Sequence, residues 1–177
     1  MFREARRGST CDDARMAVEE SEADFAVAAT REEGRWEVTA LPPRAGVSLE
    51  TLVHALRQQP GDGGAIGLVS VGDDFFLALR VNGPEVRLLV SDATAAEEWS
   101  IAAEALDALG EPAPDPDDDD GPVGDLSLFS DLGFDALELE AICDDVELYP
   151  DEMLTSIASR LGFAEAFEDA VDAATGG

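Results

Sequence analysis

The sequence has no lysine, only one histidine and only two cysteines. A catalytic or metal-binding histidine needs partner groups, and His54 has no second histidine to assist it, so a surface or core-edge imidazole is expected. Cys11 and Cys143 form no Cys-x-x-Cys pair, which excludes zinc-ribbon and dithiol redox motifs. No stretch approaches the roughly 20 apolar residues of a membrane-spanning helix. These absences exclude most metal, thiol and membrane functions.

The amino-terminal residues also lack the apolar core of a secretory signal. Residues 1–22 are polar and carry four arginines against six acids. We expect them to form a disordered extension of a cytoplasmic protein, and translation could start at Met1 or at Met16.

Negative charge is what the chain has in excess, and it is concentrated toward the end. The formal net charge is −29, from 11 arginines and 40 acids. Residues 23–95 carry six arginines against ten acids, whereas residues 96–177 carry only Arg160 against 24 acids. A general bias toward solubility would place an excess of acids in both parts of the chain, so this distribution favours a localised acidic surface. Such a surface repels nucleic-acid phosphates and attracts a basic protein.

A stretch rich in proline and aspartate divides the chain. Residues 111–123 contain four prolines and six acids, which predicts a solvated acidic linker. Its aspartates do not fit a calcium-binding loop, because placing Gly121 at the invariant glycine puts Pro116 at the first ligand position. We expect residues 23–110 to form a sheet domain and residues 124–174 a helical module.

Apolar residues alternate through most of the first domain, as they do in half-buried strands. The predicted strands cover residues 24–30, 35–40, 65–71, 75–81 and 86–91. Ser48 is expected to cap a helix over 49–56, and the capping box Thr94–Glu97 to open a second helix. The fold class is therefore α+β, with a mainly antiparallel five-stranded sheet in the order ββαβββα, covered by these helices on one face.

Helical spacing replaces alternation after the linker. Asp125 is expected to cap a short helix over 126–132, and the capping box Asp135–Glu138 to start a helix that ends near Val146. Further helices are expected after Pro150 and Phe163. Ser-x-Leu-Gly-Phe occurs twice, at 130–134 and 159–163, either as a common helix stop signal or as part of a duplicated helix pair.

The helical module supplies the candidate functional residues, a set of acids that could bind a partner. Cys143 lies among them, and acidic neighbours should raise the pKa of its thiol and make it unreactive. No catalytic, cofactor-binding or metal-binding residue is predicted. The candidate partner-binding acids are Asp135, Glu138, Glu140, Asp144, Asp145, Glu147, Asp151 and Glu152.

Several segments together resemble a known family. They are Phe25-Ala-Val-Ala-Ala, Gly34-Arg-Trp-Glu-Val, Asp74-Phe-Phe-Leu-Ala-Leu-Arg-Val, Arg87-Leu-Leu-Val-Ser-Asp-Ala93, the acidic linker, Gly124-Asp-Leu-Ser-Leu-Phe-Ser-Asp-Leu-Gly-Phe134 and Ile157-Ala-Ser-Arg-Leu-Gly-Phe163. Over about residues 23–170 the chain is similar to the actinobacterial tRNA adenosine deaminase-associated proteins. The resemblance implies association with that deaminase and carries over no functional residue. The deaminase's own zinc motif, H-x-E with P-C-x-x-C, is absent.

The leading hypothesis is therefore a non-catalytic accessory protein without a cofactor, whose acidic helical module docks on a basic surface of tRNA adenosine deaminase. A second hypothesis is a nucleic-acid mimic or regulator that binds another basic protein. A third is an enzyme whose site lies on the sheet domain, which would need a pocket with perturbed titratable groups.

Overall fold

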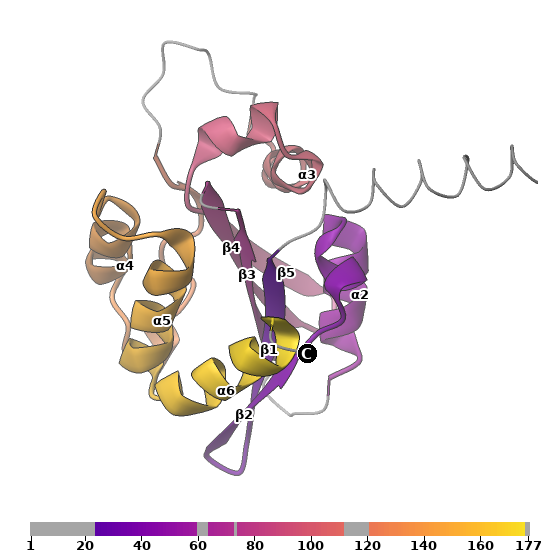
Figure 1. Ribbon diagram of the computed structural model, residues 1–177, viewed down its shortest axis with the longest axis vertical. Helices are drawn as coiled ribbons and strands as arrows, with labels where there is room; N and C mark the ends of the chain where they lie inside the picture. The colour runs from indigo at the N-terminus through magenta and orange to yellow at the C-terminus, as the bar shows by residue number, and fades with distance from the viewer. Residues whose placement is uncertain (1–23, 60–63, 73, 112–120, 176–177) are drawn as a thin grey trace, which may run out of the picture.

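The structure is a computed structural model that describes residues 24–59, 64–72, 74–111 and 121–175 (Figure 1). One antiparallel sheet runs through its centre, in the strand order β2-β1-β3-β4-β5-β6. The strands are β1 (Phe25–Glu32), β2 (Arg35–Ala40), β3 (Ala65–Val71), β4 (Phe75–Asn82), β5 (Glu85–Val90) and β6 (Val123–Gly124). The first five correspond to the predicted strands, and the α+β class is confirmed.

The predicted number of strands was wrong, because the sheet has six strands and not five. β6 begins inside the segment predicted to be linker and pairs with β5 through Val90↔Val123 and Leu89↔Gly124. A strand of two residues is too short to show alternation of apolar and polar residues. β6 forms only because Val123 and Gly124 pair with the edge of β5. Gly124 is required there, because its φ is 119° and an added Cβ would lie 2.5 Å from the Leu88 carbonyl oxygen.

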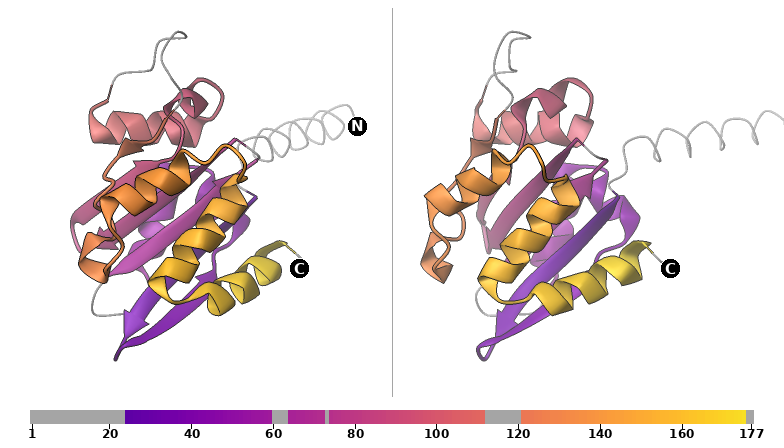
Figure 2. Two further views of the ribbon diagram at one scale, coloured as in Figure 1. Left: turned by 90° about the vertical axis from the view of Figure 1, so that its left-hand side faces the viewer. Right: turned by 60° about the vertical axis from the view of Figure 1, so that its left-hand side comes forward.

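Helices cover both faces of this sheet (Figure 2). One face carries α2 (Leu49–Arg57) and α3 (Ser100–Leu109), and the other carries α4 (Ala136–Cys143), α5 (Pro150–Leu161) and α6 (Ala164–Thr175). The adjacent residues Phe75 and Phe76 show this division, because both are fully buried and they belong to the cores on opposite faces. Successive side chains of a strand point to opposite faces, so a sheet buried on both sides loses its polar alternation.

The helices α4, α5 and α6 thus share a core with the sheet. The domain boundaries proposed from the sequence stay a prediction. Phe167 of α6 packs edge-on against Phe25 of β1, with ring centroids 5.9 Å apart. Phe163 lies 4.8 Å from the ring of Trp36 in β2. These contacts place α6 across β1 and β2, as the two views of Figure 2 show.

Two predicted helix starts were wrong. Thr94–Glu97 does not open α3; a 3₁₀ turn over Ala93–Glu97 forms instead, with the Asp92 side chain accepting from the Thr94 amide at 2.9 Å. α3 begins only at Ser100, after Trp99 in an extended conformation. The Trp99 indole N–H donates to Asp74 at 2.8 Å, and its ring packs on Phe75, so contacts with the sheet interrupt the predicted helix.

Asp125 likewise caps no helix over 126–132. Its Oδ1 accepts from the Ser127 amide at 2.9 Å, and its Oδ2 accepts from Arg87 Nε at 2.6 Å. The chain makes turns here, with a 3₁₀ helix only at Ser130–Leu132. The ion pair with β5 therefore holds Asp125 in an Asx turn rather than at a helix start.

Several other local signals formed as predicted, although α4 ends at Cys143 and not near Val146. Ser48 caps α2, and Asp135 and Glu138 make a complete capping box at α4. Gly133 and Gly162 adopt the left-handed conformation, and in each case the following phenylalanine amide bonds back five residues, a Schellman motif. The common stop signal and the duplicated helix pair both remain open as explanations. In the part of the chain that the structure describes, no helix is both long and apolar enough to span a bilayer.

Candidate functional site

The layer formed by α4, α5 and α6 carries most of the uncompensated charge. Residues 121–175 contain fourteen acids and a single basic residue, Arg160. Arg160 pairs with Glu138, and its guanidinium lies 5.8 Å from the centroid of the Phe134 ring. Two arginines reach across from the sheet, where Arg80 pairs with Asp131 and Arg87 with Asp125. All three pairs involve acids no later than Glu138, so the acids that follow have no counter-ion among the described residues.

Four of the eight predicted partner-binding acids hold local structure. Asp135 accepts from the Leu137 amide at 3.1 Å, and Glu138 accepts from the Asp135 amide at 3.3 Å. Asp145 accepts from the Glu147 amide at 3.0 Å, and Glu152 from the Tyr149 amide at 2.9 Å. These carboxylates have a sufficient structural explanation, because each satisfies a backbone donor at a turn or a helix start.

The other four predicted acids have no such explanation. The carboxylates of Glu140, Asp144, Glu147 and Asp151 accept no hydrogen bond and form no ion pair with any described residue. Glu140 is half-buried, and the other three are exposed. They occupy α4, the connection to α5 and the first turn of α5, so they extend over one continuous segment.

Asp144 and Asp145 follow the carboxyl end of α4, where negative charge is unfavourable. The last carbonyls of a helix carry a partial negative charge, and a neighbouring carboxylate typically costs about 0.3–1 kcal/mol. Burial, together with Asp144 and Glu140, raises the pKa of the intervening Cys143 thiol to about 12. The direction of the predicted rise is therefore confirmed, with burial as its largest cause, and the low reactivity of the Cys143 thiol stays a prediction.

The same segment exposes large apolar side chains, which the sequence analysis did not single out. Among the described residues, the exposed large hydrophobics are Leu137, Val146 and Tyr149, at 72%, 97% and 58% of full exposure. One signal was available in the sequence. Leu137 and Leu139 are two residues apart, so a helix cannot turn both toward one core, and only Leu139 is buried. Val146 is exposed because α4 ends at Cys143, three residues before its predicted end.

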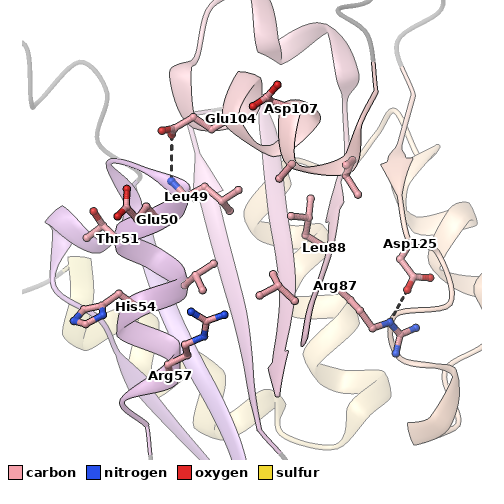
Figure 3. A pocket seen from close by; sticks show the side chains of 14 residues that line it. Leu49, Glu50, Thr51, His54, Arg57, Arg87, Leu88, Glu104, Asp107 and Asp125 are labelled. Atoms are coloured by element: carbon pink, nitrogen blue, oxygen red, sulfur yellow. Dashed lines mark hydrogen bonds and ion pairs between the residues drawn. The ribbon is translucent and has the colours of Figure 1, made fainter. Parts of the chain in front are cut away.

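A wide concave surface lies on the opposite face of the sheet (Figure 3). It is a groove of about 1040 Å³ between α2, β5 and α3, with an apolar floor that includes Val53, Val86 and Leu88. Two of its charged side chains make internal contacts. Arg57 donates to the Gly83 carbonyl at 3.2 Å, and Glu104 accepts from the Leu49 amide at 3.2 Å.

Arg87 and His54 also line this groove, together with Glu50, Asp107 and Asp125 (Figure 3). The hydrogen bond with Asp125 raises the pKa of Arg87, so this arginine is charged and already paired with a carboxylate. His54 is exposed, and its Nε2 shares a 2.7 Å hydrogen bond with the side-chain amide nitrogen of Gln58. This confirms the expected surface imidazole. Within the described ranges, no cluster of three or more His, Cys, Asp or Glu side chains could hold a metal. Of the groove's other polar groups, the Thr51 hydroxyl shares a 2.7 Å hydrogen bond with the Ser48 hydroxyl.

Comparisons with known proteins give one consistent match. The model of the family described as Rv3753c-like tRNA adenosine deaminase-associated protein matches residues 24–164. The chain is also 42% identical, over 151 residues, to Protein Rv3753c of Mycobacterium tuberculosis (strain ATCC 25618 / H37Rv). That alignment covers 84% of this chain and 87% of the relative. No solved structure matches the chain.

Proposed function

This chain belongs to the Rv3753c-like tRNA adenosine deaminase-associated protein family, and from that membership we propose that it is a non-catalytic accessory protein that binds a tRNA adenosine deaminase. The observation that carries the proposal is the set of carboxylates without counter-ions on α4 and at the start of α5. An enzyme that acts on tRNA must present basic side chains to phosphates. The acidic segment is complementary to such a surface.

Docking of the helical layer on that basic surface would compete with tRNA phosphates for the same arginines and lysines. The accessory protein would then modulate access of tRNA to the deaminase. Two features of the helical layer support a binding role over a catalytic one. Four of its eight candidate acids already satisfy backbone amides, and within the described ranges no group of three or more His, Cys, Asp and Glu side chains could hold a metal.

The test is co-purification of the full chain with the deaminase at about 50 mM and about 500 mM salt. We expect a complex at low salt that weakens at high salt, because screening acts on exposed charge pairs. Absence of a complex at low salt would contradict the proposal. Recovery of a different basic protein from the same lysate would favour the alternative of a regulator with another target.

Two matched variants test which carboxylates act. The first neutralises the unpaired acids of the candidate surface, as Glu140→Gln, Asp144→Asn, Glu147→Gln and Asp151→Asn. The second makes the same change of charge on α6, as Glu165→Gln, Glu168→Gln, Asp169→Asn and Asp172→Asn. We expect the first to weaken binding at least about tenfold and the second much less. Equal loss from both would show that net charge alone attracts the partner.

A further inference from the structure

The connection between α4 and α5 presents apolar side chains from a rigid turn. We refer to residues 144–149 as the α4–α5 corner. Asp145 accepts from the Glu147 amide at 3.0 Å through its side chain and from the Leu148 amide at 3.2 Å through its carbonyl. Leu148 is half-buried against the core of the helical layer, which anchors the turn. The backbone of the corner is thus held in place before any partner arrives.

Val146 and Tyr149 point away from this anchored backbone. Val146 is 97% exposed and Tyr149 is 58% exposed, although α5, which follows them, buries its apolar residues well. The Tyr149 amide donates to Glu152 at 2.9 Å, and α5 begins at the next residue, so Tyr149 is also held at a defined position. Apolar groups on a preorganised turn lose little conformational entropy on binding, and tyrosine is frequent at binding hot spots.

The charges around the corner restrict what can cover it. Asp144, Glu147 and Asp151 have no side-chain partner among the described residues, and residues 136–159 contain no arginine, lysine or histidine. A second copy of the chain that docked through the same surface would bring the same carboxylates against these, and a nucleic acid would bring phosphates. Both would be repelled, so a basic protein surface is the occupant that the corner fits.

We propose that the α4–α5 corner is the apolar anchor of the partner-binding surface. Val146 and Tyr149 would enter a shallow apolar depression on a basic protein, while Asp144, Glu147 and Asp151 meet arginine or lysine at its rim. This inference rests on the proposed function for the identity of the partner, the deaminase. It adds that affinity comes from an uncharged contact as well as from the carboxylates.

The experiment measures the dissociation constant of the full chain with the purified deaminase at two salt concentrations. The test variant is Val146→Ser with Tyr149→Ser. It should fold normally, because Val146 is almost fully exposed and serine is a favourable residue before the first turn of a helix. The control is Leu137→Ser, which removes a large exposed apolar side chain from the other end of α4.

We expect the double variant to bind at least about tenfold more weakly at both salt concentrations, because contact between apolar groups is not screened. Leu137→Ser should change the dissociation constant by less than about twofold. If the wild-type chain does not bind the deaminase at all, the proposed function fails, and the inference fails with it. If the wild type binds and the double variant binds equally well, or if Leu137→Ser causes the same loss, the inference alone is overturned.

Discussion

The two faces of the sheet have similar cores and different surfaces. Each face is sealed by fully buried aromatic and aliphatic side chains, with Phe75 on one side and Phe76 on the other. On the α2–α3 face, some charged groups are engaged, as in Arg57–Gly83 and Arg87–Asp125, whereas the carboxylates of Glu50 and Asp107 have no partner among the described residues. On the α4–α6 face, Glu140, Asp144, Glu147 and Asp151 have no described partner. The two faces therefore differ in the supply of arginine, because residues 121–175 contain only Arg160.

The largest expected effect tests whether the two faces fold as one unit. Phe75→Ala and Phe76→Ala should each lower the free energy of unfolding by about 3–5 kcal/mol, because each deletes a fully buried ring. Since β4 supplies both side chains, we expect each variant to unfold in a single denaturant transition. Circular dichroism measures this transition. A separate early transition in Phe76→Ala alone would show that the helical layer unfolds independently.

The next effect tests the electrostatic field on the helical face. With a thiol pKa of about 12, against an ordinary value of 9.0, Cys143 should react roughly a thousandfold more slowly with a thiol reagent at pH 8 than an unfolded chain does. The variant Cys11→Ser leaves Cys143 as the single thiol for this measurement. Rapid labelling of the native protein would contradict the described environment of Cys143.

The same shift predicts a dependence of stability on pH. The neutral thiol is favoured in the folded state, so its stabilising contribution is fully present below pH 9 and is lost as the pH rises from 9.0 toward about 12. Cys143→Ala should therefore show a smaller loss of stability over this alkaline range than the wild type. An identical loss in both proteins, measured by urea denaturation, would contradict the prediction.

A smaller effect concerns the single arginine of the helical layer. Arg160→Gln removes the ion pair with Glu138 and the contact with the Phe134 ring, and should cost about 1 kcal/mol. The cost should increase at low salt, where repulsion among the acids is least screened. Arg57→Gln on the other face is the control, and its cost should vary less with salt. Thermal denaturation at two ionic strengths distinguishes the two faces.

The smallest effect separates stability from binding. Asp144→Asn relieves repulsion with the carboxyl end of α4 and should stabilise the protein by about 0.3–1 kcal/mol. Asp151→Asn removes a favourable charge from the first turn of α5 and should destabilise it by a similar amount. Both should weaken the complex with the deaminase. If one variant has a higher and the other a lower melting temperature, but both bind the deaminase more weakly, these acids act in binding rather than through stability.

Much of the fold and part of the site could be predicted from sequence patterns. The five longer strands, the Ser48 cap, the Asp135–Glu138 capping box and the turns at Gly133 and Gly162 all depend on residues within a few positions of one another. The eight candidate acids were identified from charge alone, which cannot tell a carboxylate that caps a helix from one without a partner. Asp145 and Asp144 are neighbours in the sequence, and only Asp145 binds a backbone amide.

Local pattern and charge by themselves therefore determined the α+β class, most helix and strand identities and the concentration of acids after residue 96. Only the tertiary structure decided that β6 joins the sheet, that Trp99 delays α3 and that Val146 is left exposed. The physical reason is distance along the chain. Each of the first two depends on a contact with β5 or with the turn before β4, which a local pattern does not contain. The exposure of Val146 depends on which surfaces the packed core leaves uncovered.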